Sequence, residues 1–235
     1  MSEINITLKN VYEITLAALK GAGANQDNAA SVARSTVLAE RDGTRSHGLM
    51  YVPIYAEHII CGKVDGAAKA DVNCTRPSAI CVDAKSGFAH PAIDAGWDAF
   101  TAAARTNGVA AMTIYNSYNC GVLGHHAERL AEHGLVGLCF THAPASIAPV
   151  GGNKPVIGTN PIAIAVPDAN GGAAIVIDQS ASVVAKSEIM LRARTGKSIE
   201  NHWALDEHGQ PTTDPNLALK GSMAPSGGYK GFGIG

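Results

Sequence analysis

The sequence predicts an α/β fold in which short strands alternate with helices. The clearest strands are residues 161–166 and 173–177, two short runs of Ile, Val and Ala bounded by Gly, Pro, Asn and Asp. Further short apolar runs at 79–82, 109–114 and 135–140 are separated by stretches long enough for helices. Aromatic residues make up only 5% of the chain and small residues are abundant, which suits closely packed layers of helices and strands.

The first sixty residues are predicted to be helical. An apolar face with helical spacing begins after Thr7 and stops at a Gly-Ala-Gly segment. Asn25 can cap a second helix that runs to about residue 40, and Pro53 can open a short third helix. The polar segment 41–48, RDGTRSHG, connects the second and third helices and contains His47.

The composition of the sequence changes near residue 75. After this point the predicted strands alternate with predicted helices. A turn is expected at 87–90, and from residue 195 the chain is rich in turn residues, with a possible hairpin at 206–210. The predicted helices of this part span residues 91–105, 124–133 and 183–194.

Composition and charge exclude several classes of protein. The chain has 235 residues, of which 46% are hydrophobic and 16% charged, as in an ordinary globular protein with a substantial core. The net charge of −2 and the lack of a basic stripe give no support for nucleic-acid binding. No apolar run reaches about 18 residues, so no membrane span is expected. Five cysteines without a Cys-x-x-Cys pair predict neither a disulfide framework nor a zinc ribbon, and they favour the reducing cytoplasm.

The common nucleotide, metal and nucleophile motifs are also missing. The sequence has no P-loop, no Gly-x-Gly-x-x-Gly between a first strand and a helix, and no Gly-x-Ser-x-Gly elbow. No metal site is expected, because His-Glu-x-x-His does not occur and the adjacent pair His125 and His126 cannot share one face of a helix.

Two polar segments remain as candidates for chemistry. His47 lies outside any apolar face, so it can titrate near neutral pH and transfer a proton, or it can be an ordinary exposed loop histidine. The segment 178–182, Asp-Gln-Ser-Ala-Ser, follows the second clear strand and can hold a polar cofactor. The alternative is that Asp178 and Ser180 cap the following helix.

Six stretches, in order along nearly the whole chain, resemble the type-2 malate/L-lactate dehydrogenase family. This family also includes sulfolactate, ureidoglycolate and diketogulonate oxidoreductases and the Δ1-piperideine-2-carboxylate/Δ1-pyrroline-2-carboxylate reductases. The sequence of residues 116–185 is most similar to the sequences of the cyclic-imine reductases. The matching stretches are RDGTRSHG (41–48), GFAHPAIDAG (87–96), NSYNCGVLGHHAERLAEHGLVGL (116–138), IAPVGGNKPVIGTNPIAIAVP (147–167), IDQSASVVA (177–185) and GGYKGFG (227–233).

The resemblance implies a non-Rossmann α/β fold with a helical N-terminal portion and a central mixed sheet flanked by helices. On this basis residues 1–75 are expected to form the helical portion with the catalytic loop. Residues 76–235 are expected to form an α/β cofactor-binding domain, truncated at its C-terminus because family members continue further. The resemblance further implies a homodimer and NADH or NADPH as cofactor, while charge and composition predict no nucleic-acid or membrane partner.

The resemblance also assigns roles to residues. His47 matches the family's proton donor, and Asp178 matches the acidic residue that serves as its partner. Two positions depart from the family pattern: Tyr51 stands where members often have a carboxylate-binding Arg, and Asn119 replaces a histidine that transfers protons in some members. The implied substrate-binding residues are Ser46, Tyr51, Asn119 and Thr159. The implied cofactor-binding residues are Asn160, Ile177, Asp178, Gln179, Ser180, Ala181, Ser182, Val183, Tyr229 and Lys230.

These assignments lead to one expected function and two alternatives. The expected function is NAD(P)H-dependent hydride transfer to or from a small 2-oxo or 2-hydroxy acid. The first alternative is reduction of a cyclic 2-imino acid, Δ1-piperideine-2-carboxylate or Δ1-pyrroline-2-carboxylate. The second is a fragment that binds a nucleotide without turnover. Substitution of His47 separates an enzyme from a binding protein, because only an enzyme loses turnover.

Overall fold

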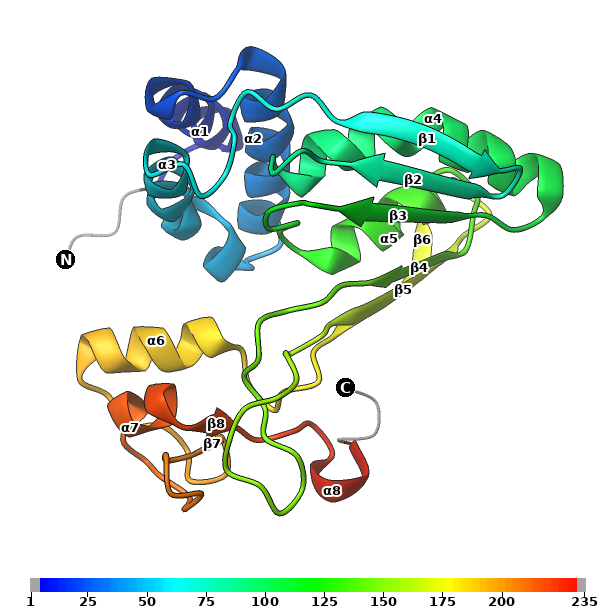
Figure 1. Ribbon diagram of the computed structural model, residues 1–235. Coiled ribbons are helices and arrows are strands. Elements are labelled where there is room, and N and C mark those ends of the chain that lie inside the picture. Colours follow the sequence, from blue (N-terminus) through cyan, green and yellow to red (C-terminus); the bar gives the residue numbers. More distant parts are fainter. Residues whose placement is uncertain (1–4, 232–235) are drawn as a thin grey trace. The chain divides into compact units, whose positions relative to one another are not determined.

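The computed structural model describes residues 5–231 and shows two compact units, Met1–Val122 and Leu123–Gly235 (Figure 1). Each unit is described by itself. The boundary that the sequence predicts near residue 75 falls inside the first unit, at the end of its strand β1 (Asp71–Arg76). The division into residues 1–75 and 76–235 stays a prediction. No helix among residues 5–231 is long and apolar enough to cross a membrane.

The first unit begins with three α-helices and two short 3₁₀ turns. The predicted cap at Asn25 is confirmed, and Thr7 caps the first helix in the same way: their side chains accept hydrogen bonds from backbone N–H groups three residues later, at 2.8 and 3.1 Å. Gly23 ends the first helix with a φ of 114°, which a side chain would disfavour. A buried cluster that includes Leu19, Val32 and Tyr55 holds the helices together. The elements are α1 (Leu8–Ala22), α2 (Gln26–Arg41), η1 (Arg45–His47), η2 (Leu49–Tyr51) and α3 (Val52–Ile60).

A three-stranded mixed sheet completes the first unit. Strand β2 (Ala79–Asp83) lies between β1, which is antiparallel to it, and β3 (Ala111–Tyr115), which is parallel. Helix α4 (Ala89–Asn107) packs closely on this sheet, since a Cβ on Gly96 would lie 2.6 Å from the Met112 sulfur. The helix begins at Ala89, so the turn predicted at 87–90 is shorter than expected.

The second unit contains an antiparallel sheet in which β5 (Ile162–Pro167) lies between β4 (Gly137–Phe140) and β6 (Ala173–Gln179). The two clearest predicted strands are therefore confirmed as neighbours. Helix α5 (Leu123–Glu132) packs on the sheet, and the buried residues Ala163 and Ala165 of β5 leave room for it. The side chains of Leu138 and Phe140, on β4, are 59% and 69% exposed.

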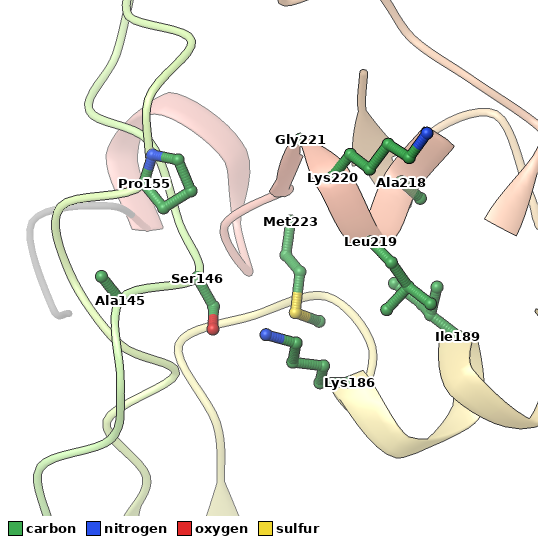
Figure 2. A pocket seen from close by; sticks show the side chains of 10 residues that line it. All are labelled: Ala145, Ser146, Pro155, Lys186, Ile189, Ala218, Leu219, Lys220, Gly221 and Met223. Atoms are coloured by element: carbon green, nitrogen blue, oxygen red, sulfur yellow. The ribbon is translucent and has the colours of Figure 1, made fainter. Parts of the chain in front are cut away.

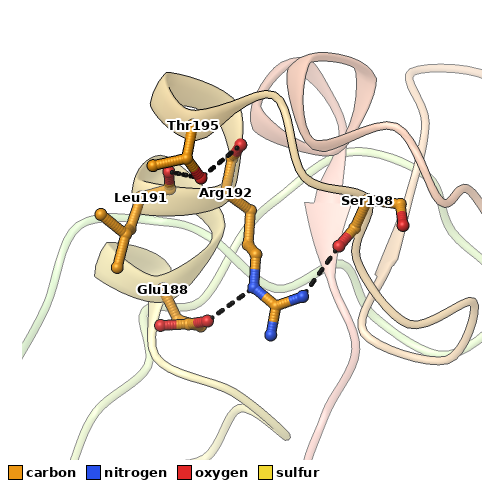
Figure 3. Close-up of polar contacts among 5 residues, drawn as sticks. All are labelled: Glu188, Leu191, Arg192, Thr195 and Ser198. Carbon is orange, nitrogen blue, oxygen red and sulfur yellow. Dashed lines mark hydrogen bonds and ion pairs between the residues drawn. The ribbon is translucent and has the colours of Figure 1, made fainter.

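The remainder of the second unit is built from short elements around a second core cluster that includes Ile147, Ile189 and Met223. Arg192 connects its own helix to the loop that follows it. Its guanidinium donates to the Glu188 carboxylate in the helix at 2.8 Å and to the Ser198 carbonyl in the loop at 3.0 Å (Figure 3). The predicted turn at 206–210 is present between short β-bridges. The elements are α6 (Lys186–Thr195), β7 (Ala204–Leu205), α7 (Pro215–Lys220), β8 (Ser222–Met223) and α8 (Gly228–Gly231).

Helix α6 corrects one expectation. It begins at Lys186 rather than at residue 183, and its N-cap residue, Ala185, has no side chain that can cap. Asp178 and Ser180 therefore do not cap this helix, and the capping alternative for these two residues is wrong. The segment 180–185 is instead an irregular loop between β6 and α6.

Candidate active site

The loop that carries His47 is fixed by contacts with helix α2. The Glu40 carboxylate accepts a hydrogen bond from the Leu49 backbone N–H at 2.7 Å. A Cβ on Gly48 would lie 2.1 Å from the same carboxylate oxygen, so a side chain at this position would displace the Glu40 carboxylate. The Ser46 hydroxyl lies 3.0 Å from His47 Nδ1 and orients the half-buried imidazole. These contacts hold His47 in one orientation at the end of α2.

An aromatic cluster extends from His47 into the core of the first unit. The rings of His47 and Tyr51 are nearly parallel, with centroids 6.5 Å apart, and Tyr51 meets Tyr55 edge-on at 4.8 Å. Tyr118 contacts Tyr55 at 6.0 Å and hydrogen-bonds through its hydroxyl to His58 Nδ1. Burial, and next the neighbouring Tyr51 phenol, raise the pKa of Tyr118, so its hydroxyl stays protonated at neutral pH.

Asn119 lies on the loop between β3 and the end of the first unit. Its side-chain oxygen accepts hydrogen bonds from the Tyr55 hydroxyl at 3.1 Å and from the Gly121 N–H at 2.7 Å. The structure therefore brings together the predicted residues Ser46, His47 and Tyr51, and links Asn119 to them through Tyr55. The sequence argument missed Tyr55, His58 and Tyr118. Their helical spacing could have indicated a cluster, because Tyr51, Tyr55 and His58 are four and three positions apart and so share one face of a helix.

In the second unit, Asp178 has a structural partner. Its carboxylate Oδ2 accepts a hydrogen bond of 2.7 Å from the Gly124 N–H, in the first turn of α5. A negative charge at this end of a helix is favourable, because the first N–H groups of the helix point toward it. Gly124 allows the approach, since a Cβ there would lie 3.1 Å from the Asp178 carboxylate. The hydrogen bond from Gly124 to Asp178 thus connects the end of β6 with the start of α5.

The loop that follows β6 is held by its own hydrogen bonds. The Thr159 carbonyl accepts from the Ala181 N–H at 2.7 Å and from the Ser180 hydroxyl at 3.2 Å. The hydroxyls of Ser180 and Ser182 lie 2.8 Å apart, and the Ser182 hydroxyl donates to the Val184 carbonyl. The Val183 N–H donates to the Ala224 carbonyl, which ties the loop to the segment after β8. The serine side chains therefore fix the shape of the loop.

The remaining predicted residues of this unit lie around the same loop. Asn160 has a φ of 27° and accepts a hydrogen bond from the Ala143 N–H at 3.0 Å. Ile177 and Gln179 are exposed on β6, and Lys230 is exposed on α8. Tyr229 belongs to α8, but its side chain lies outside the described part of the structure.

A cavity of about 180 Å³ opens beside this loop in the second unit. Figure 2 shows Lys186, the first residue of α6, with its amino group extended into the space beside Ser146 and Met223. Lys220 lies on the opposite rim, and Ile189 forms part of an apolar wall. None of the residues predicted from the sequence lines this cavity.

The chemistry of the exposed groups in the second unit fits a nicotinamide nucleotide. The Asp178 carboxylate and the Gln179 carboxamide are acceptors and donors of the kind that bind ribose hydroxyls, and the Lys230 ammonium suits a phosphate. His47 belongs to the first unit and Asp178 to the second, so their partnership stays a prediction.

Comparison with known proteins shows which proteins this chain resembles. The family model described as malate/L-lactate dehydrogenase matches residues 6–235. A (2R)-3-sulfolactate dehydrogenase (NADP(+)) of Chromohalobacter salexigens is 44% identical over 229 residues, which are 97% of this chain and 68% of that protein. Δ1-pyrroline-2-carboxylate reductase 1 of Burkholderia ambifaria is 36% identical over 234 residues, 100% of this chain and 68% of that protein.

The fold has a solved counterpart. The crystal structure of Δ1-piperideine-2-carboxylate reductase from Pseudomonas syringae superposes with a TM-score of 0.93 and 32% identity, over 99% of this chain and 70% of that one. The chain thus spans about two thirds of the length of each of these relatives.

Proposed function

The chain belongs to the malate/L-lactate dehydrogenase family, and from this premise we propose that it is an NAD(P)H-dependent oxidoreductase that transfers a hydride between the cofactor and a small 2-oxo or 2-hydroxy acid. The observation that carries the proposal is the oriented histidine: His47 is held by Ser46 in a loop that Glu40 fixes. A sulfolactate dehydrogenase that uses NADP(+) among the relatives supports the reaction class and the cofactor.

His47 acts as the proton donor. When bound, the nicotinamide cofactor supplies the hydride. Hydride addition to a C=O bond leaves negative charge on the oxygen, and a protonated imidazole delivers the proton that neutralises it; in a C=N substrate the imidazole protonates the nitrogen before the hydride is added, so that the product amine is neutral. Since Ser46 engages Nδ1, the proton is delivered from Nε2. In the reverse reaction the neutral imidazole accepts the proton of the substrate hydroxyl.

The cofactor is assigned to the second unit. Asn160, residues 177–183 and the pair Tyr229 and Lys230 are the proposed contacts, and the hydrogen bonds of the loop supply its fixed shape. A loop that is already ordered loses little conformational entropy when a ligand binds. Ser46, Tyr51, Asn119 and Thr159 are the proposed substrate contacts, and Asp178 is proposed as the acidic partner of His47.

Reduction of a cyclic 2-imino acid is the second candidate, and one observation favours it. Tyr51 places an aromatic ring next to His47 where family members often carry Arg. A protonated cyclic imine is a cation, and a cation is attracted to an aromatic face, whereas the neutral keto group of an oxo acid is not. Reductases of Δ1-pyrroline-2-carboxylate among the relatives support this candidate.

We further propose a homodimer in the cytoplasm. Leu138 and Phe140 present large apolar surface on β4, and such exposed surface commonly marks a protein interface. The five cysteines form no disulfide in the described part of the structure, as is usual in a reducing compartment. Light scattering tests the dimer, and a monomeric mass at micromolar concentration would refute it.

The direct test of the function is oxidation of NADH and of NADPH, followed by loss of reduced-nicotinamide absorbance. Pyruvate, oxaloacetate, 3-sulfopyruvate and Δ1-piperideine-2-carboxylate are offered in parallel to the purified chain. Turnover of an oxo acid supports the first candidate, and turnover of the imine alone supports the second. A folded protein that binds NADPH but turns over none of the four would instead be a nucleotide-binding protein.

A further inference from the structure

The orientation of the Asn119 side chain is fixed by two donors. The Gly121 N–H lies 2.7 Å from Oδ1, and the Tyr55 hydroxyl lies 3.1 Å from the same atom. A backbone N–H can only donate, so the atom that faces Gly121 must be the carbonyl oxygen of the amide. The amide nitrogen, Nδ2, therefore points away from both partners.

Nδ2 is consequently a donor that the protein itself does not use. Within residues 5–231, the Asn119 nitrogen makes no hydrogen bond, while its oxygen makes two. The side chain is half-buried. A half-buried amide nitrogen that is left without a protein acceptor is suited to a ligand that offers an oxygen.

Tyr55 donates one of the two hydrogen bonds that orient the Asn119 amide. It is 1% exposed, and its ring is enclosed by Tyr51, Phe88 and Tyr118 at centroid distances of 4.8, 5.6 and 6.0 Å. Burial foremost, and then the neighbouring phenols, raise the pKa of the Tyr55 hydroxyl. The hydroxyl therefore keeps its proton and donates to Asn119 over the whole physiological range.

The same ring contacts connect Asn119 with the proposed proton donor. His47 lies parallel to Tyr51, and Tyr51 packs on Tyr55, whose hydroxyl reaches Asn119. The four residues belong to one compact unit, and these contacts connect Asn119 to His47 through Tyr55 and Tyr51.

We propose that Asn119 Nδ2 binds the carboxylate of the substrate and that Tyr55 is the positioning residue that aims it. The proposal rests on the proposed function, in which the substrate is a small 2-oxo or 2-imino acid. Its carboxylate needs N–H or O–H donors, and the Tyr51 phenol beside His47 brings no charge. Asn119 cannot protonate the reacting heteroatom, because an amide does not titrate, so binding is the chemistry open to it.

The test measures binding of stable carboxylates to the purified chain in the presence of saturating NADPH. Oxamate and pyrrole-2-carboxylate mimic the open-chain and ring substrates, and pyrrole-2-carboxamide is the uncharged control. Isothermal titration gives the dissociation constants for the wild type and for Asn119→Ala, Asn119→Asp and Tyr55→Phe. Tyr118→Phe is the matched control, because it removes a phenol hydroxyl from the same cluster without touching Asn119.

The expected result is a loss of affinity confined to carboxylates. Asn119→Ala weakens carboxylate binding about tenfold, as expected for one hydrogen bond to a charged group, and Asn119→Asp weakens it further through like-charge repulsion. Tyr55→Phe weakens it about threefold, because only the Gly121 N–H then orients the amide. Pyrrole-2-carboxamide binding changes less than about twofold in every variant, and KM rises while kcat changes little.

Three outcomes overturn the proposal. If Asn119→Ala binds the carboxylates as tightly as the wild type does, Asn119 does not contact the substrate carboxylate. An equal loss in Tyr118→Phe and Tyr55→Phe shows a general packing effect instead of positioning. A wild type that binds NADPH but neither carboxylate overturns this inference alone, whereas a wild type that does not bind NADPH contradicts the proposed function. If Tyr55→Phe does not fold, the two Asn119 variants still decide the question.

Discussion

The contact between Asp178 and the first turn of α5 predicts that Asp178→Ala destabilises the second unit. The carboxylate accepts the Gly124 N–H at 2.7 Å, and the two residues are 54 positions apart in the sequence. The substitution removes both a hydrogen-bond acceptor and a negative charge from the N-terminus of a helix. The Gly124 N–H then has to be satisfied by water.

The magnitude follows from these two losses. An N-cap acceptor stabilises a helix by about 0.5–2 kcal/mol, and a charge near the helix N-terminus adds about 0.3–1 kcal/mol. Because Asp178 is exposed, water and salt reduce both contributions, so we expect a loss of about 1–2 kcal/mol. For a chain of this size, that corresponds to a fall in Tm of about 2–8 °C. Asp178→Asn keeps an acceptor oxygen and should cost about 0.5 kcal/mol.

Urea unfolding followed by far-ultraviolet circular dichroism measures the loss. Asp98→Ala is the control, since Asp98 is also exposed and its side chain makes no contact of this kind in the described structure. It should change the free energy of unfolding by less than about 0.5 kcal/mol. If Asp178→Ala unfolds at the same urea concentration as the wild type, the hydrogen bond between Asp178 and Gly124 does not stabilise the second unit and the prediction is wrong.

Three further predictions concern Gly158, Gly21 and Tyr55. Gly158→Ala should destabilise the chain by about 2–4 kcal/mol, because the new Cβ would lie 2.0 Å from the Ala143 carbonyl oxygen, and backbone cannot move aside. Gly21→Ala, in α1 with nothing within 4 Å of the new Cβ, should stabilise it by up to about 1 kcal/mol in the same urea assay. The pKa of Tyr55 is raised by burial, so its stabilising effect is complete below the unfolded-state pKa of about 10 and is lost as pH rises above it. Tyr55→Phe should therefore flatten the alkaline limb of a stability-against-pH curve, and an unchanged limb would refute this.

Features fixed by neighbouring residues were predictable from the sequence. Thr7 and Asn25 cap their helices because the N–H groups they accept from lie three residues away. The strands β5 and β6 follow from short apolar runs between turn residues. The polar loop of His47 was recognisable because it breaks the helical pattern on both sides.

Features that depend on tertiary contacts were not predictable in this way. Strand β1 lacks an alternating apolar pattern, since it is an exposed edge strand, and it was missed. The six-residue helix α7 is too short for a periodic signal. Capping of the following helix was one alternative for Asp178, but its carboxylate accepts a hydrogen bond from Gly124, 54 positions earlier in the sequence. The bond between Tyr55 and Asn119 spans 64 positions and has no local signature.

The central claim is that His47 delivers the proton in a nicotinamide-dependent reduction, and turnover by His47→Gln tests it most directly. The variant is compared with the wild type on the substrate that the wild type reduces, with NADPH affinity measured in parallel by cofactor fluorescence. Loss of a general acid lowers kcat about 10²–10⁴-fold, and NADPH affinity should change less than about twofold. A kcat within about threefold of the wild type, with NADPH bound as before, would contradict the account and move the proton donor to another residue.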